Sequence, residues 1–146
     1  EQFRFWQHLA NAGLITGTYS GTEGPDGASH AVIGTNIPAS KYNSGGWSTG
    51  AVGYHPGNTW WFEGEYGHIF RLGIENSPWT ASQPVAPPED AWNIDKKLDD
   101  GKPGTGSVRI ENRNICTDSA AADDWEADYL LTTSVDTCTI MFTNAF

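Results

Sequence analysis

Residues 88–112 read PEDAWNIDKKLDDGKPGTGSVRIEN, and this segment carries the clearest structural pattern in the chain. A proline opens it, as suits the first turn of a helix. An acidic pair follows and a lysine pair stands near the other end, which matches the polarity of a helix dipole. Three apolar residues at helical spacing form one stripe, namely Ala91, Ile94 and Leu98. The pattern predicts a helix over residues 88–99, ended by Gly101, and a strand over residues 107–112.

Three carboxylates gather where this helix is expected to end. Asp95, Asp99 and Asp100 stand in its last turn or just after it, where the negative end of the helix dipole disfavours them. A compensating partner is therefore expected: a backbone N–H of the loop at 101–106, an arginine such as Arg109, or a hard cation such as Ca²⁺. The spacing differs from that of an EF-hand loop. Two interpretations remain open, a pinned structural loop and a calcium site formed by the three aspartates, and no other cofactor is indicated.

The rest of the chain predicts another helix and several short strands. Residues 2–12 place apolar side chains on much the same face, and Gly13 follows as a left-handed cap. β-branched or aromatic runs between Gly, Pro and Asn predict strands over residues 30–35, 47–54, 59–65, 68–74, 128–131 and 139–143. The runs 59–65 and 68–74, separated by Tyr66-Gly67, are the best hairpin candidate. The predicted fold class is α+β: an antiparallel β-sheet with an N-terminal helix and a second short helix.

The composition indicates one folded domain with few aliphatic side chains. Leu, Ile, Val and Phe make up 26 of 146 residues and the formal net charge is −10, values close to those of disordered chains. Seven Trp and five Tyr favour a packed aromatic core instead. We expect a single domain over residues 1–146, with a Gly- and Trp-rich half (1–80) and an acidic half (81–146), because neither half has enough aliphatic residues for its own core. The acidic excess argues against nucleic acid as a partner. The sequence contains no apolar run of about 18 residues, so it predicts no membrane span.

Two cysteines, Cys116 and Cys138, stand in the acidic half. A disulfide between them would stabilise the fold by roughly 3.4 kcal/mol through chain entropy. It would also place the protein in an oxidising compartment outside the cytoplasm. The alternative is a pair of buried free thiols. Zinc or redox chemistry is not indicated, because there is no CxxC and no flanking His.

No pattern in the sequence is typical of an enzyme active site. The four histidines lack metal-ligand spacing, and there is no GxSxG, phosphate loop or HExxH. Acidic residues are plentiful, but nothing singles out one pair at the separation a glycosidase needs. We therefore expect no catalytic residues and no enzyme activity.

The adjacent residues Trp60 and Trp61 are candidate ligand contacts. Exposed aromatic rings in Gly-rich loops are a common way of holding carbohydrate, which makes both residues candidate glycan contacts. The alternative is that they fill a core that is short of Leu and Val. Neighbouring residues of a strand point to opposite faces, so one of the two indoles is expected on an outer face.

Two segments of the chain resemble bacterial type IV pilin-like proteins and pseudopilins, which carry a prepilin-type cleavage and methylation signal. Residues 5–15, FWQHLANAGLI, are similar to the helix that follows the long N-terminal helix in some of those proteins. Residues 91–109 resemble their C-terminal region. The late pair Cys116 and Cys138 resembles the pilin disulfide loop.

This resemblance implies the headgroup of a structural subunit of a type IV pilus or a type II secretion-like pseudopilus. Such a subunit polymerises with other pilin or pseudopilin subunits through an N-terminal helix, which also supplies its only membrane contact. The sequence opens at Glu1, so that helix and the processing signal are expected to be missing and the chain alone to be monomeric. The implied location is the bacterial cell envelope, extracellular or periplasmic. The alternative function is an extracellular carbohydrate-binding or adhesin-like module.

Overall fold

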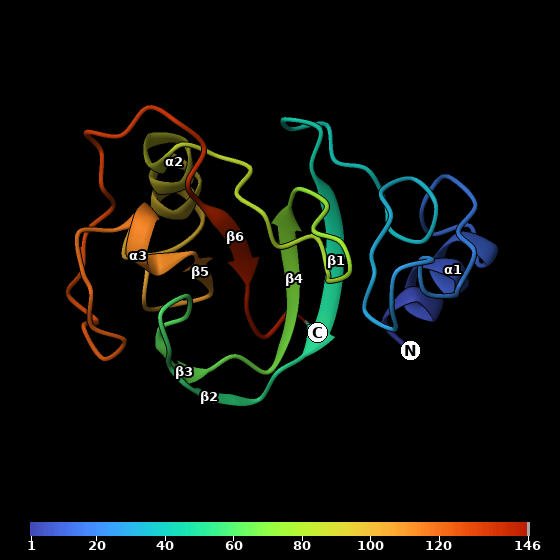
Figure 1. Ribbon diagram of the computed structural model, residues 1–146, viewed down its shortest axis with the longest axis horizontal. Coiled ribbons are helices and arrows are strands. Elements are labelled where there is room, and N and C mark those ends of the chain that lie inside the picture. The colour runs from blue at the N-terminus through green and yellow to red at the C-terminus, as the bar shows by residue number, and fades with distance from the viewer. Residues whose placement is uncertain (146) are drawn as a thin grey trace.

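The computed structural model describes residues 1–145 and has an α+β fold, as the sequence predicts (Figure 1). Its main sheet has four strands in the order β1-β4-β6-β5, each antiparallel to its neighbours. In chain order these strands are β1 (Gly46–Ala51), β4 (His68–Gly73), β5 (Val108–Glu111) and β6 (Thr139–Phe142). A second sheet pairs β2 (Tyr54–Pro56) with β3 (Glu63–Glu65). The helices are α1 (Gln2–Asn11), α2 (Pro88–Leu98) and α3 (Arg113–Cys116).

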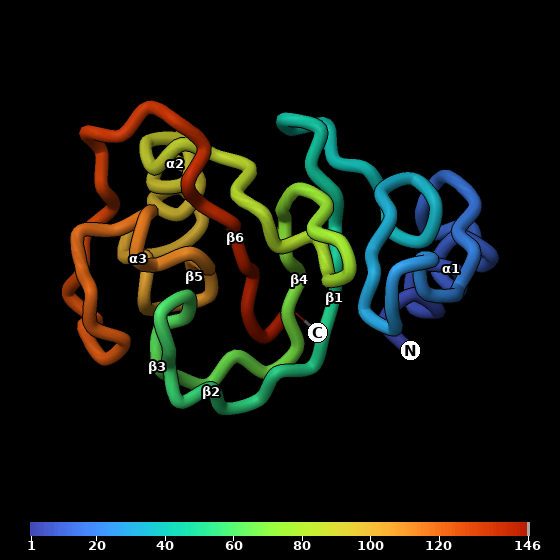
Figure 2. Tube along the Cα trace, viewed as in Figure 1, coloured from blue at the N-terminus to red at the C-terminus, as the bar shows by residue number. Residues whose placement is uncertain are grey.

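The two predicted helices, α1 and α2, pack on the same face of the main sheet. Phe70 and Leu72 of β4 share this face, because alternate residues of a strand point the same way. Helix α1 sets Phe5 and Trp6 against Phe70, with ring centroids 5.9 and 5.7 Å away. Helix α2 contributes Ala91 to the buried cluster that contains Leu72. Helix α1 lies at the β1 edge and α2 on the β5 and β6 side (Figure 2).

The core on this face is aliphatic under α2 and aromatic under α1. The cluster under α2 contains Leu72, Val85, Val108, Ile110 and Ile140. The cluster under α1 contains Phe3, Trp6, Ala31, Ile37 and Ala81, with Phe70 and Trp47 packed against it. The tryptophans and phenylalanines thus take the place of the missing aliphatic residues near α1.

The segment of residues 52–66, which includes β2 and β3, covers the opposite face of the sheet. Between this segment and the sheet lies a small buried cluster, in which Tyr66 of the segment packs with Ile69 and Met141 of the sheet. Beside this small cluster the sheet carries two charged side chains, Arg71 and Glu111, which form an ion pair. This face is therefore mixed in polarity, whereas the helix-covered face is apolar.

The main sheet joins the two halves of the sequence. Strands β1 and β4 come from residues 1–80 and strands β5 and β6 from residues 81–146. Strand β4 pairs with β6, so that Leu72 lies opposite Ile140. The Gly- and Trp-rich half and the acidic half therefore share one sheet.

The predicted hairpin between residues 59–65 and 68–74 is wrong. Strand β4 pairs with β1 and β6, and the short β3 pairs with β2. The reason lies at Asn58, whose side-chain Oδ1 accepts hydrogen bonds from the backbone N–H groups of Trp60 and Trp61 at 2.7 and 2.9 Å. An Asn side chain that binds nearby backbone in this way makes a turn, so the strand begins only at Glu63.

Two other predicted strands are reduced to isolated bridges. In residues 30–35, only Ile33 pairs, with Ile37, because the Asn36 side chain takes the backbone N–H of Val32 at 2.7 Å. In residues 128–131, Tyr129 pairs only with Thr117. The run is too short to extend that bridge before the turn that follows it. Helix α3 was not expected, since its four residues are too few for a periodic pattern.

The predicted disulfide between Cys116 and Cys138 is present. It joins the end of α3 to the residue before β6, and both cysteines are fully buried. The backbone of Cys138 also bridges to Ala86, just before α2. Among residues 1–145, no helix is long and apolar enough to cross a membrane.

Candidate functional site

The three aspartates at the end of α2 come together as the sequence predicts. Asp95, Asp99 and Asp100 each offer a carboxylate oxygen, and these oxygens lie within 4.8 Å of one another. Asp95 is fully buried and accepts hydrogen bonds from the backbone N–H of Gly101 at 3.1 Å and from the Tyr129 hydroxyl at 2.7 Å. Burial raises the pKa of Asp95 to about 6, although these two hydrogen bonds work in the opposite direction.

The other two aspartates organise the loop that leads into β5. Asp99 accepts hydrogen bonds from the backbone N–H groups of Ser107 and Val108. Asp100 accepts hydrogen bonds from the backbone N–H of Lys102 at 2.8 Å and from the Thr105 hydroxyl at 2.6 Å. The backbone donors are one of the three kinds of partner that the sequence left open, and the Thr105 hydroxyl is an additional one.

Arg109, the alternative partner, points elsewhere. Its guanidinium lies 4.8 Å from the centre of the Tyr66 ring, and its Nε donates to the carbonyl oxygen of Gly106 at 3.1 Å. The described loop therefore satisfies its carboxylates from its own backbone and hydroxyl groups. Calcium binding at Asp95, Asp99 and Asp100 stays a prediction.

Trp61, one of the two candidate glycan contacts, is packed into the protein. Its ring stacks on His55 at 4.9 Å between centroids and meets Tyr66 edge-on at 5.1 Å. The Arg71 guanidinium lies 5.2 Å from its centre, and the indole N–H donates to Glu111 Oε1 at 3.2 Å. These contacts use both the ring and the N–H of Trp61.

Trp60 keeps 49% of its surface exposed. It lines a cavity of about 280 Å³ together with five polar side chains, namely Asn76, Ser82, Gln83, Glu111 and Asn112. These residues come from the turn before β3, the loop that follows β4, and the end of β5. We call this site the Trp60 cavity. Only Trp60 was identified from the sequence, because the other five residues lie in separate segments with no shared motif.

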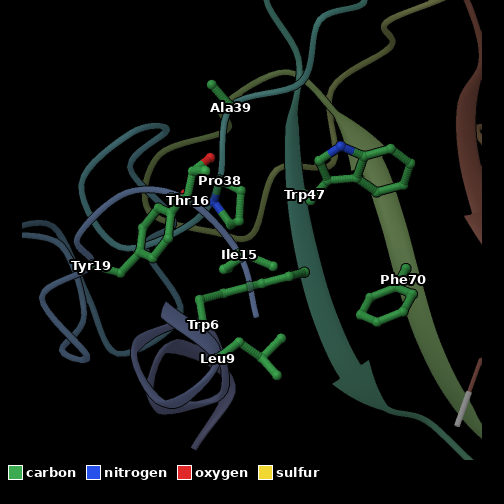
Figure 3. A pocket seen from close by; sticks show the side chains of 9 residues that line it. All are labelled: Trp6, Leu9, Ile15, Thr16, Tyr19, Pro38, Ala39, Trp47 and Phe70. Atoms are coloured by element: carbon green, nitrogen blue, oxygen red, sulfur yellow. The ribbon is translucent and has the colours of Figure 1, made fainter. Parts of the chain in front are cut away.

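A second, larger cavity lies where α1 meets the sheet (Figure 3). It encloses about 410 Å³, and its walls include Trp6, Leu9, Trp47 and Phe70. The side chains come from α1, from β1 and β4, and from the loops between α1 and β1, and they are almost all apolar. This cavity is therefore an open apolar gap between helix α1 and the sheet.

The acidic loop between the cysteines has a basic neighbour from elsewhere in the chain. Lys102 Nζ lies 2.9 Å from Asp128 Oδ1 and 3.9 Å from Glu126 Oε2, and it also donates to the Glu126 carbonyl oxygen at 3.0 Å. The loop after α2 and the disulfide loop are thereby connected. The positive charge of Lys102 thus compensates part of the negative charge of the disulfide loop, which has no basic residue of its own.

A comparison of this chain with protein-family models, with curated proteins and with solved structures finds no match.

Proposed function

We propose that this chain is the headgroup of a filament subunit, of the kind that builds a type IV pilus or a type II secretion-like pseudopilus. The observation that carries the proposal is the docking of α1 on the sheet. Helix α1 lies on the face that α2 also covers, and its Phe5 and Trp6 pack against Phe70. A helix anchored in this way can transmit the position of a preceding assembly helix to the whole headgroup.

The outward side of α1 supplies a surface for subunit contacts. Glu1, Arg4, His8 and Asn11 are all exposed, and their spacing of three or four residues places them along one stripe of the helix. This α1 stripe carries charge of both signs. Charge patterns of this kind set the register between neighbouring molecules more than they set affinity.

The disulfide and the two segments that resemble pilin-like proteins support the same proposal. The bond between Cys116 and Cys138 fits an oxidising compartment, and a filament subunit of the cell envelope is exposed to one. The partners in this proposal are other pilin or pseudopilin subunits, and the location is extracellular or periplasmic. The subunit acts by its shape and surface, without catalysis.

The test expresses the complete gene, including whatever precedes Glu1, in a bacterial host that assembles type IV pili or pseudopili. Filaments sheared from the cells are examined by immunoblotting and immunogold electron microscopy. We expect the subunit in the filament fraction, and we expect loss of that signal when the host's prepilin peptidase is deleted. Exclusive recovery as a secreted monomer would overturn the proposal.

Variants of the α1 stripe sharpen this test. We expect Arg4→Glu to lower the yield of filaments while leaving the melting temperature of the headgroup unchanged, since Arg4 is exposed. Lys41→Glu is the matched control, because it makes the same change of charge at an exposed residue outside α1. Equal filament yields from the two variants would argue against the α1 stripe as a contact surface.

A further inference from the structure

We propose that the Trp60 cavity binds one neutral sugar ring of a glycan, with Trp60 as its stacking platform. The inference rests on residues that the filament proposal does not use, and it holds whether or not that proposal does. The cavity of about 280 Å³ lies just below the range of about 300–1,000 Å³ that small-molecule sites cover. A single ring therefore fits better than an extended chain.

Trp60 offers the face that a sugar ring needs. Its indole is half exposed at the wall of the cavity, and within residues 1–145 its Nε1–H has no hydrogen-bond partner. The C–H face of a pyranose is apolar while its rim carries hydroxyl groups. A rigid aromatic ring with a polar edge matches both parts of such a ligand.

The side chains around Trp60 are held in fixed orientations by one another. Gln83 Nε2 donates to Asn76 Oδ1 at 3.0 Å, and Asn76 Nδ2 donates to Ser82 Oγ at 2.8 Å. Asn112 Nδ2 donates to Thr139 Oγ1 at 2.9 Å. Because these bonds fix the amide planes in advance, a ligand would meet a site that is already organised.

This arrangement leaves both donors and acceptors available. Within the described chain, Gln83 Oε1 and Asn112 Oδ1 accept no hydrogen bond, and the Ser82 hydroxyl donates none. Asn112 is only 6% exposed, so its free oxygen belongs to the cavity wall rather than to open surface. Sugar hydroxyls donate and accept at once, and a wall that offers both functions suits them.

The charge of the site favours a neutral ligand. Glu111 is the single charged residue of the lining, and its carboxylate is already paired with Arg71 and bonded to the Trp61 indole. No lysine or arginine lines the cavity to bind an acidic sugar, and the chain as a whole carries a formal charge of −10. Sialic and uronic acids are therefore disfavoured.

The backbone below Trp60 is also fixed, which helps to separate binding effects from folding effects. The Trp60 N–H donates to Asn58 Oδ1, and its carbonyl oxygen accepts from the Arg113 N–H at 3.1 Å. Both bonds use main-chain atoms of Trp60, so they remain possible when the Trp60 side chain is replaced. We therefore expect Trp60→Ala to fold.

The experiment screens the 146-residue chain on an array of glucose-, galactose- and mannose-terminated oligosaccharides, with sialylated and galacturonate oligosaccharides beside them. The best neutral glycan is then titrated by calorimetry against the parent chain and its variants. We expect Trp60→Ala and Gln83→Ala each to weaken binding by about tenfold or more, as central aromatic and polar contacts do. Trp125→Ala is the matched control, since Trp125 is equally exposed but lies outside the cavity. It should bind like the parent chain.

Three results would overturn the proposal. The first is an array on which no neutral glycan binds. The second is binding confined to acidic glycans. The third is a loss of affinity in Trp125→Ala as large as that in Trp60→Ala. If Trp60→Ala were to unfold, Gln83→Ala decides alone, because Gln83 is an exposed side chain.

Discussion

Arg71 Nε and Glu111 Oε2 lie 2.7 Å apart and join β4 to β5 across the intervening strand β6. Both side chains are about nine-tenths buried, and the contact is an ion pair rather than an aligned hydrogen bond. The Trp61 indole contacts both partners, through its N–H to Glu111 and its ring to Arg71. Burial raises the pKa of Glu111, and the charge of Arg71 opposes that rise. Glu111, which lines the Trp60 cavity, thus belongs to a charge pair that needs both of its members.

Removal of one member of this pair should therefore cost more than removal of both. We expect Glu111→Leu to lower the free energy of unfolding by about 3–5 kcal/mol, because it leaves Arg71 buried without its counter-charge. The double variant Arg71→Met/Glu111→Leu should recover much of that loss. Urea unfolding of the parent chain, both single variants and the double variant measures the coupling. Purely additive effects would show that the pair contributes no coupling energy.

The sequence predicts the elements whose signals are local. Helix α2 starts at Pro88 as predicted, and α1 ends within one residue of its predicted end. Strand β4 lies inside its predicted run, and β1 overlaps its predicted run but begins one residue before it. Both strands form where expected because their β-branched and aromatic residues also pair across the sheet. The hairpin prediction failed for a different reason. The side chain of Asn58 competes for backbone donors, and neither hydrophobic period nor composition records such competition.

The two candidate sites also differ in whether their residues are close together in the sequence. Asp95, Asp99 and Asp100 lie within six residues of one another, so a helix end was enough to bring them together. The Trp60 cavity joins Trp60 to Gln83 and Glu111, which are more than twenty residues apart in the chain. Their meeting depends on the pairing of β6 with β4 on one side and with β5 on the other, which no local pattern specifies.

The disulfide should be a large part of the stability of this chain. Both sulfur atoms are buried, and the bond closes the long acidic loop between α3 and β6. We expect Cys138→Ser, or reduction in mild denaturant, to lower the free energy of unfolding by about 2–5 kcal/mol. Thermal unfolding with and without a phosphine reductant measures this. An unchanged melting temperature after complete reduction, verified by thiol titration, would contradict the expectation.

Trp6 should stabilise the seam between α1 and the sheet by its ring and not by its N–H. The residue is 6% exposed, and within residues 1–145 its buried Nε1 finds no hydrogen-bond partner. We expect Trp6→Ala to cost about 3–5 kcal/mol, as the loss of a buried aromatic ring does. Trp6→Phe should cost much less, because it keeps most of the ring contact with Phe70 and removes an unsatisfied polar group. Equal losses in the two variants would point to a bonded N–H.

The buried carboxyl of Asp95 should make stability depend on pH. Its pKa is raised from 3.8 to about 6 in the folded chain, mainly by burial, whereas in the unfolded chain it titrates near the ordinary value. Between about pH 4 and pH 6 the folded state therefore holds a proton that the unfolded state has released. Stability linked to this group is greatest below pH 4 and falls as the pH rises to 6. The loss amounts to roughly 3 kcal/mol.

Asp95→Asn isolates this contribution, because its side chain does not titrate. Its amide oxygen can accept from the Gly101 N–H as Oδ1 does, and its NH2 group, in the place of Oδ2, can donate to the Tyr129 hydroxyl oxygen. We expect the stability of the variant relative to the parent chain to increase between pH 4 and pH 6 and then to level off. Urea unfolding at several pH values measures the difference, in which other titrating groups cancel. Glu23→Gln, which removes one carboxylate at an exposed position, is the control. A relative stability of Asp95→Asn that stays constant from pH 4 to pH 7 would show that Asp95 is ionised throughout. Burial would then be outweighed by its hydrogen bonds to the loop.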